Sequence, residues 1–401
     1  MALTATAFFA PCPRGLEAAL ADELRALGAD VVAAPPGGVR FEGDATIGFA
    51  ANLHSRIASR VLQQVAHAPY RTEDDLYRIA RDTEWERWHE PLASLRIDTT
   101  AIGAPVRSLQ FATLRIKDGL VDRLRERFGE RPSIDRQRPD RRVFAFLEAG
   151  RCTLYLDWSG ESLFKRGWRR EGVDAPMKEN LAAGLLALSG WTPGTPLLDP
   201  FCGSGTIVVE AAMIAAGMPP GAQRRFAFER MRGFDRDAWD RMRRVAPRPA
   251  PASASIFGSD VSEAALAAAR SNLARCGADP AWVSLRQLDA LHLDRAPAEA
   301  GLLLANPPYG ERLDVKGRQS LAHADAFWPA FATLLKQRFS GWTACLFSSD
   351  LALPQRLRLK PSKRTPLFNG ALECRLFRFE MVAGSARRPK DGATDDGPRE
   401  A

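Results

Sequence analysis

The first part of the chain alternates between two kinds of apolar spacing. Alternation and short apolar runs predict strands in "TATAFFAP" and "GGVRFEG", whereas three- and four-residue spacing predicts helices in "GLEAALADELRALGA" and "ATIGFAANLHSRIASRVLQQV". Strands and helices mixed in this way are typical of a small α+β unit. We therefore expect such a unit over residues 1–66, with strands at 4–11 and 37–43 and helices at 15–29 and 45–65.

A second unit follows, and its elements are longer. Amphipathic helices are predicted over 73–88 and 111–129, with a strand at 94–101 between them. Two alternating segments on either side of residue 150 predict a hairpin. We expect this second α+β unit to span residues 67–160.

Beyond residue 160 strands alternate with helices, which is the pattern of a parallel α/β sheet. The last two strands flank Asn369-Gly370, a strong short hairpin signal. The Gly-, Pro- and charge-rich tail over 383–401 is predicted to be disordered. The predicted strands lie at 196–199, 255–260, 283–289, 301–306 and 343–349, followed by a hairpin within 356–381.

The composition excludes few classes of protein. A chain of 401 residues with 45% apolar residues is long enough for two or three globular domains at about 150 residues each. The net charge of +8 favours an anionic partner such as nucleic acid, although a high-GC genome would enrich arginine equally well. Enzyme, binding protein and scaffold all remain open at this point.

Cysteine usage and the N-terminus bear on location. The six cysteines are far apart and form no CxxC pair or Cys/His cluster, so we expect a reduced protein without a metal site. The first residues lack a basic segment followed by a long apolar core, and no apolar run is long enough to span a bilayer. These features predict a cytoplasmic protein with no membrane partner.

Candidate chemistry begins at the stretch "LLDPFCGSGTIVVEAAMIAAG". An acid at a strand end, Asp199, precedes a turn with Gly203 and Gly205 and then a helix, so a ligand can approach the backbone closely at the helix N-terminus. The stretch lacks the GK[ST] of a phosphate-binding loop. It also departs from the dinucleotide-binding fingerprint, because Val208 stands where a third glycine is expected.

Two further acids end the next two strands. Asp260 stands where a nucleotide-binding sheet holds a ribose, although it is farther along the chain than usual. An arginine- and aromatic-rich insertion over 219–249 explains the extra length, either as a solvated excursion or as a surface that faces nucleic acid. Asp289 follows the third strand, where it can accept a hydrogen bond from an adenine amino group or simply cap a helix.

The stretch "LLANPPYGERL" places Asn306 to Tyr309 after the fourth strand, at the edge of the sheet where open α/β sheets bind ligands. The amino group of a nucleobase is a poor nucleophile, because its lone pair is delocalised into the ring. If the Asn306 side chain and the Pro307 carbonyl each accept one N–H, they orient that nitrogen and stabilise its developing positive charge. Tyr309 offers a flat face on which an extruded base stacks.

These motifs together resemble the class I S-adenosylmethionine-dependent amino-methyltransferases. "DDLYRIARDTEWERW", "SLQFATLRIKDGLVDRLRERFG", "LFKRGWRREGVDAPMKENLAAGLL" and "RRFAFERMRGFD" narrow the resemblance to the THUMP-domain bacterial 23S ribosomal RNA guanine-N2 methyltransferase family. The resemblance covers the chain to about residue 382. It implies a ferredoxin-like unit (1–66) and a THUMP RNA-binding domain (67–160), then a class I Rossmann-like methyltransferase domain (161–382), a mostly parallel seven-stranded sheet with a C-terminal antiparallel hairpin. Some relatives carry a second methyltransferase domain after this one. The present sequence ends before such a domain, so we expect it to make only one modification.

The resemblance also implies roles for individual residues. The helix at 175–186 would close over the cofactor, or it is an ordinary packing helix. The methionine end of the cofactor S-adenosylmethionine would be held by Asp199, Phe201, Gly203 and Gly205. Asp260 would hold its ribose and Asp289 its adenine. The target base would be held by Asn306, Pro307, Pro308 and Tyr309.

Several alternatives remain at this level. The "NPPY" motif also serves adenine-N6, transfer RNA guanine-N2 and glutamine-N5 methyltransferases. A non-catalytic RNA-binding assembly factor with a vestigial methyltransferase fold is a further reading, against which the intact acidic and glycine positions argue. Structured RNA, most simply large-subunit ribosomal RNA, is the expected partner, while the target nucleotide and the oligomeric state stay open.

Overall fold

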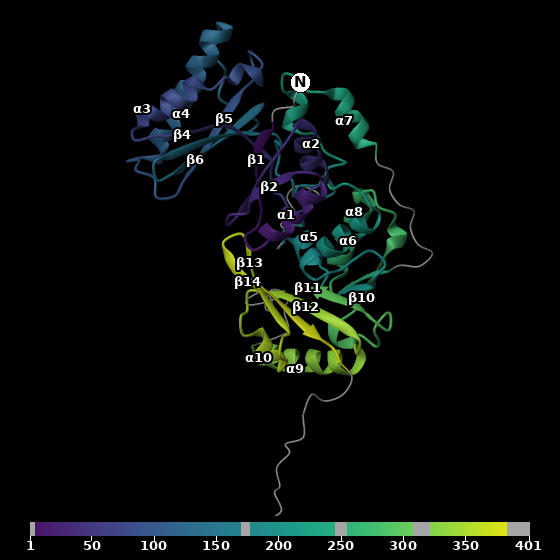
Figure 1. Cartoon of the computed structure of the whole chain (residues 1–401). Coiled ribbons are helices and arrows are strands. Elements are labelled where there is room, and N and C mark those ends of the chain that lie inside the picture. Colours follow the sequence, from purple (N-terminus) through teal and green to yellow (C-terminus); the bar gives the residue numbers. More distant parts are fainter. Residues whose placement is uncertain (1–4, 170–176, 245–254, 308–320, 383–401) are drawn as a thin grey trace, which may run out of the picture.

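Two seven-stranded sheets organise the protein, one in the N-terminal half and one in the C-terminal half (Figure 1). The computed structural model describes residues 5–169, 177–244, 255–307 and 321–382. Pro308, Tyr309 and the tail predicted over 383–401 lie outside these residues.

The first sheet runs through both N-terminal units. Its elements are β1 (Thr6–Pro11), α1 (Glu17–Ala26), β2 (Asp30–Ala33), β3 (Gly38–Gly43), α2 (Ala45–His54), β4 (Leu62–Pro69), α3 (Glu73–Asp82), the 3-10 turn η1 (Trp85–Arg87), β5 (Leu95–Ala101), α4 (Leu109–Phe128), β6 (Arg141–Glu148) and β7 (Arg151–Asp157). The strand order is β2-β3-β1-β4-β7-β6-β5. Because β4 pairs with β1 on one side and β7 on the other, it joins the two units into one sheet, and the predicted boundary at residue 66 falls within it.

The helix predicted over 45–65 is wrong in its second half. The helix α2 ends at His54, and Leu62 already belongs to the central strand β4. The buried Glu23 carboxylate explains the break, because it accepts hydrogen bonds from the backbone N–H groups of Arg56 and Ile57, both at 3.2 Å. Helical spacing is a local signal, and here a distant carboxylate and strand pairing override it.

The second sheet has the predicted mostly parallel arrangement, which ends in an antiparallel hairpin. Five parallel strands are followed by an antiparallel hairpin, in the order β10-β9-β8-β11-β12-β14-β13, which confirms the predicted fold class. The elements are α5 (Glu179–Leu188), β8 (Leu197–Asp199), α6 (Thr206–Ala215), η2 (Ala227–Arg230), α7 (Arg236–Arg243), β9 (Ile256–Asp260), α8 (Glu263–Cys276), η3 (Pro280–Trp282), β10 (Val283–Gln287), η4 (Ala290–His292), β11 (Gly301–Ala305), α9 (Leu321–Arg338), β12 (Trp342–Ser348), α10 (Leu353–Leu357), β13 (Lys363–Asn369) and β14 (Leu372–Glu380).

Strand β11 shows how both faces of this sheet are covered. Leu302 and Leu304 point into the core shared with α5 and α6, whereas Leu303 and Ala305 point into a second core with α9. A strand buried on both faces has a continuous apolar sequence, as "GLLLA" has.

The described part of the insertion, residues 219–244, is neither a solvated excursion nor a set of exposed stacking platforms. Phe226, Phe228 and Trp239 are all at most 3% exposed, and the Phe228 ring centroid lies 4.6 Å from that of Phe49 on α2 and 5.8 Å from that of Trp158. Burial of large aromatic rings dominates packing energy. The described part of the insertion therefore fastens the methyltransferase domain to the N-terminal sheet.

Two buried arginines strengthen the same junction. Arg224 donates to the carbonyl oxygens of Glu161, Ser162 and Lys165. Arg141 on β6 donates to the carbonyl oxygen of Arg230 in the insertion, and burial lowers the pKa of Arg141 to about 10. Both guanidinium groups are engaged inside the protein, so neither is available for a phosphate.

We expect Phe228→Ala to lower the free energy of unfolding by roughly 3–5 kcal/mol, since it removes a ring from the middle of this aromatic cluster. Urea denaturation followed by tryptophan fluorescence measures the effect. Arg241→Ala, an exposed change on α7, is the control and should stay within about 0.5 kcal/mol of wild type. Equal stability of the two variants would contradict a fastening role for the insertion.

Candidate functional site

The carboxyl ends of four neighbouring strands bring the predicted site residues to one edge of the second sheet. Asp199 ends β8, Asp260 ends β9, Asp289 follows β10 and Asn306 follows β11, and the strand order is β10-β9-β8-β11. The chain moves outward in opposite directions from β8 and from β11. Ligands of open α/β sheets bind at such a point of reversal.

The glycine turn between β8 and α6 has a left-handed backbone at both glycines. Gly203 has φ +54° and Gly205 has φ +82°, and a Cβ added at Gly203 would meet no atom within 4 Å. Asn272 on α8 holds the turn in place, because its side-chain amide donates to the Ser204 carbonyl oxygen at 2.9 Å. The turn is therefore open at Gly203 and held by a hydrogen bond on the side that faces α8.

Asp260 bonds to this turn. Its Oδ2 accepts the Gly203 N–H at 3.0 Å, and its Oδ1 accepts the Ser262 N–H at 2.9 Å. Each carboxylate oxygen can accept more than one hydrogen bond. Asp260 therefore positions the glycine turn and keeps acceptor capacity for a ligand hydroxyl.

Asp199 is 2% exposed and accepts one backbone N–H, that of Phe201, at 3.1 Å. Burial raises the pKa of Asp199 to about 8, the hydrogen bond from Phe201 opposes this shift, and the nearby Asp260 charge adds to it. Two carboxylates thus share a confined space beside the glycine turn. Such a pair favours a cation.

Asp289 caps the short η4 turn, because its Oδ1 accepts the Leu291 N–H at 2.9 Å. Its side chain remains 42% exposed, and its Oδ2 lies 3.9 Å from His292 Nδ1. The capping alternative raised by the sequence is therefore present, and the second oxygen remains accessible.

Asn306 leaves a buried acceptor unpaired. Its Oδ1 is buried and has no hydrogen-bond donor among the residues that the structure describes, and Pro307 next to it is buried. Buried polar atoms in native proteins are nearly always hydrogen-bonded, so an exception of this kind at a sheet edge indicates a ligand contact.

Phe201 turns its ring away from the glycine turn. The ring packs edge-on against Phe331 at 5.5 Å and Phe327 at 6.1 Å, both on α9, and it is half-buried. The structure therefore packs Phe201 against the α9 face of the sheet.

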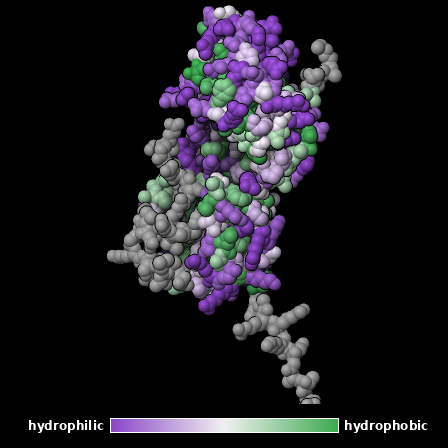
Figure 2. All heavy atoms as spheres, turned by 90° about the vertical axis from the view of Figure 1, so that its left-hand side faces the viewer, coloured by the Kyte–Doolittle hydropathy of each residue, from purple (hydrophilic) through white to green (hydrophobic). Residues whose placement is uncertain are grey.

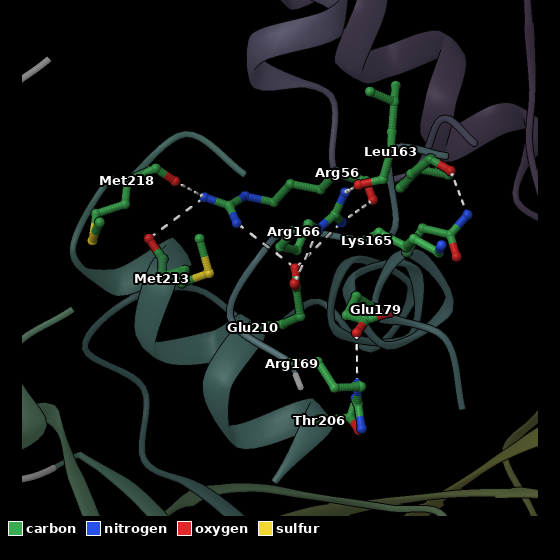
Figure 3. A network of polar contacts seen from close by, with 12 residues as sticks. Arg56, Leu163, Lys165, Arg166, Arg169, Glu179, Thr206, Glu210, Met213 and Met218 are labelled. Atoms are coloured by element: carbon green, nitrogen blue, oxygen red, sulfur yellow. Dashed lines mark hydrogen bonds and ion pairs between the residues drawn. The ribbon is translucent and has the colours of Figure 1, made fainter. Parts of the chain in front are cut away.

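Arg169 is a site residue that the sequence analysis missed. Its guanidinium donates to Glu179 at 2.8 Å and to the Thr206 hydroxyl at 2.9 Å (Figure 3). It also donates to the Ser204 hydroxyl at 3.2 Å. It therefore places a positive charge over the glycine turn. The basic run "KRGWRR" was the only local signal, and its spacing says nothing of the partner.

Helix α6, which starts at the glycine turn, is anchored by a buried ion cluster. Glu210 is fully buried and lies 3.2 Å from Arg166 Nε and 3.8 Å from Arg56 Nη1 (Figure 3). Arg56 also donates to the carbonyl oxygens of Met213 and Met218. Because Arg56 belongs to the N-terminal sheet unit, that unit holds the helix behind the glycine turn.

The helix predicted over 175–186 corresponds to α5, and it is packed on nearly all sides. The residues from Glu179 to Leu186 are all buried. Asn180 donates to the Ile57 carbonyl oxygen at 3.2 Å and the Ser59 hydroxyl at 3.1 Å. These contacts establish the packing role, and closure over a cofactor stays a prediction.

Comparison with known protein families now places the chain. Residues 166–378 match the RMKL-like methyltransferase domain, residues 7–62 the RlmL ferredoxin-like domain and residues 70–157 the THUMP domain. The chain belongs to the RMKL-like methyltransferase family. The family and the three-part organisation inferred from the sequence motifs are thereby confirmed.

Individual members of the family are similar over most of this chain. The ribosomal RNA large subunit methyltransferase K/L of Aeromonas salmonicida is 36% identical over 97% of the chain, which spans 56% of that relative. A Synechocystis sp. protein, provisionally named an RNA methyltransferase, is 38% identical, with 94% of this chain and 97% of that protein covered. The crystal structure of SMU.472, provisionally called a methyltransferase and complexed with SAH, superposes with a TM-score of 0.84 at 28% identity, covering 96% and 99% of the two chains.

Among the described residues no three His, Cys, Asp or Glu side chains are arranged to hold a metal ion. The helices in the described ranges are all too short or too polar to cross a membrane.

The raised pKa of Asp199 predicts a pH-dependent stability. Because the folded-state pKa of about 8 exceeds the ordinary value near ~4, the stabilisation is complete below about pH 4 and is lost as pH rises through 8. Asp199→Asn keeps the acceptor for Phe201 and cannot ionise, so it should exceed wild type in stability by roughly 2 kcal/mol or more at pH 8.5.

Thermal unfolding of the cofactor-free protein at pH 5.5, 7.0 and 8.5 measures this gap. Asp294→Asn, at a side chain that is 97% exposed, is the matched control and should track wild type. A constant difference between Asp199→Asn and wild type at the three pH values would contradict the raised pKa.

Proposed function

We propose that this chain transfers a methyl group from S-adenosylmethionine to the exocyclic N2 amino group of a guanine in 23S ribosomal RNA. The observation that carries this proposal is the buried Oδ1 of Asn306, which has no hydrogen-bond partner among the described residues and lies at the reversal point of the sheet. An acceptor held there without a partner is suited to the N–H of an incoming amino group.

The charges around the glycine turn fit the cofactor. S-adenosylmethionine carries an ammonium group, a sulfonium and a carboxylate at its methionine end. The buried Asp199 and the half-buried Asp260 favour the cationic groups, while Arg169 provides a cation within reach of the same turn. The open space above Gly203 leaves room for the methionine chain. Asp260 would hold the ribose and Asp289 the adenine.

The cofactor, when bound, supplies an electrophilic methyl group on a positively charged sulfur. The chain's own contribution is orientation and electrostatics. Asn306 Oδ1 and the Pro307 carbonyl would accept the two N–H bonds of the amino group, which turns its lone pair toward the methyl group and stabilises the charge that develops on nitrogen. Pro308 and Tyr309 would complete the wall that holds the base. Nitrogen would gain the methyl group as the carbon–sulfur bond of the cofactor breaks, and it would then lose one proton to solvent, so the scheme needs no strong general base.

The choice of ribosomal RNA is supported by the N-terminal half and by the relatives. A THUMP domain shares its sheet with the ferredoxin-like unit, and the Aeromonas relative is named as a large-subunit ribosomal RNA methyltransferase. Guanine-N2 follows from the family resemblance of the motifs. Transfer RNA and adenine-N6 remain the competing substrates, and product analysis distinguishes them.

Asn306→Ala should lower the single-turnover methylation rate by about 10²-fold or more, since one preorganised contact with developing charge is lost. Cofactor and RNA affinity should change little, because the contact strengthens in the transition state. Asn306→Asp, which keeps an acceptor, should retain partial activity. Rapid-quench assays with ribosomal RNA from a strain lacking the enzyme provide the measurement.

The product of the same assay tests the substrate assignment. Mass spectrometry of the digested RNA should show N2-methylguanine. N6-methyladenine would refute the guanine assignment, and turnover near wild type in Asn306→Ala would refute the role of Asn306.

Asp260→Ala should weaken cofactor binding by roughly 1–3 kcal/mol, because it removes a ribose partner and frees the Gly203 N–H. Isothermal titration calorimetry with S-adenosylmethionine and with its demethylated product measures the change. Asp294→Ala serves as the exposed control. If Asp260→Ala bound S-adenosylmethionine as tightly as wild type, the assignment of Asp260 to the ribose would be wrong. If wild type did not bind S-adenosylmethionine, a vestigial methyltransferase fold would be favoured.

A further inference from the structure

A small cleft lies between the ferredoxin-like unit and the C-terminal hairpin. It has a volume of about 260 Å³ and is lined by Arg14 and Glu17 from the N-terminal side and by Pro366 and Phe368 from β13. The two sides approach closely, because a Cβ added at Gly15 would lie 2.5 Å from the Pro366 carbonyl oxygen. The cleft therefore lies where two segments that are far apart in the sequence contact each other.

Arg14 is exposed at this cleft, and its guanidinium donates to no polar group among the described residues. Its guanidinium carbon lies 4.5 Å from the centroid of the Phe368 ring, and no carboxylate of the described residues lies within ion-pair distance of it. Glu17, the nearest acid in the cleft lining, instead accepts the backbone N–H groups of Gly15 at 2.8 Å and Gly37 at 2.7 Å. Stacking on the ring orients the guanidinium plane, and its N–H groups remain available for an anion.

The cleft lies on the substrate side of the active edge. Strand β13 runs parallel to β11, so its end at Asn369 reaches the same edge as Asn306. In the sheet order β13 is three strands beyond β11, roughly 14 Å away at ~4.8 Å per strand, and on the side opposite β8, β9 and β10. Since the proposed cofactor residues occupy the β8–β10 half, the polynucleotide must approach over the β12–β13 half.

The shape of the molecule agrees with this path. Figure 1 places the tip of the β13–β14 hairpin below the THUMP unit and beside the ferredoxin-like unit. In Figure 2, which is turned about the vertical axis, the facing surface is hollowed at about that height, between the upper part of the molecule and the lower.

We propose that Arg14, oriented by Phe368, binds a phosphodiester group of the RNA strand next to the target nucleotide. This inference rests on the proposed function for the identity of the RNA. A guanidinium fork matches two phosphate oxygens, and a contact with the backbone positions a strand without reading its sequence. The ferredoxin-like unit thereby contributes directly to substrate placement, from a loop that also contacts the catalytic sheet.

The test compares Arg14→Gln with Arg286→Gln. Arg286 is also an exposed arginine without an ion pair in the described structure, but it lies on β10 at the opposite edge of the sheet. Binding of ribosomal RNA fragments is measured by filter binding at several salt concentrations. The Arg14→Gln variant should bind RNA about tenfold more weakly than wild type. The slope of the logarithm of its RNA-binding constant against the logarithm of salt concentration should fall by about one unit. Its affinity for the cofactor, measured by calorimetry, should be unchanged. Arg14→Lys, which keeps the charge, should keep the wild-type slope.

The outcomes separate this inference from the proposed function. RNA binding and salt slope in Arg14→Gln equal to those in Arg286→Gln would overturn the phosphate contact, whatever wild type methylates. Wild type that binds RNA without methylating it would overturn the proposed reaction, and the same binding comparison would still decide the role of Arg14.

Discussion

The buried charge of Glu210 is the constraint around which the catalytic domain is arranged. It lies on the helix that starts at the glycine turn, and its two ion-pair partners come from different parts of the chain, Arg166 from the first residues of the methyltransferase domain and Arg56 from the N-terminal unit. Removing one partner of a buried pair costs about 3–5 kcal/mol, because the remaining charge is left without compensation. The helix that shapes the candidate cofactor site is therefore held by residues outside its own sheet.

The same principle extends to the whole junction between the two halves. The Phe228 cluster, the Arg141 contact with the insertion and the Arg14–Phe368 stack all connect elements of the first sheet to elements of the second. Strand β4 makes the ferredoxin-like and THUMP units continuous by pairing with both. Consequently the position of the N-terminal half relative to the sheet edge is set by packing and hydrogen bonding, which gives the proposed RNA path a fixed geometry.

Within the site, each polar group is placed by a different device. Asp260 is held by two backbone N–H groups, Asp199 by burial and one such group, and Arg169 by an ion pair with Glu179. Among the proposed contacts that the structure describes, Asn306 differs in keeping a buried side-chain oxygen with no partner in the described residues. That contrast fits the proposal that the acids and Arg169 bind the cofactor, whereas Asn306 contacts the amino group that receives the methyl group.

Much of this protein could be read from its chain alone, and the reason is that those features are local. The five parallel strands, the hairpin at Asn369-Gly370 and the acids at three strand ends depend on short apolar runs and turn residues, and parallel strands bring their carboxyl ends to one edge by topology. The sequence did not predict the short strand β2, the end of α2 at His54 or the burial of Phe228. It also did not predict the role of Arg169 or the contact of Arg14 with Phe368.

These features depend on partners that are far away in the sequence. Glu23 accepts hydrogen bonds from the backbone after α2, and Trp158 and Phe49 pack against Phe228. Strand β13 contacts the loop at Gly15. Spacing along a chain carries no information about such partners, so only the folded arrangement of the two sheets could reveal them.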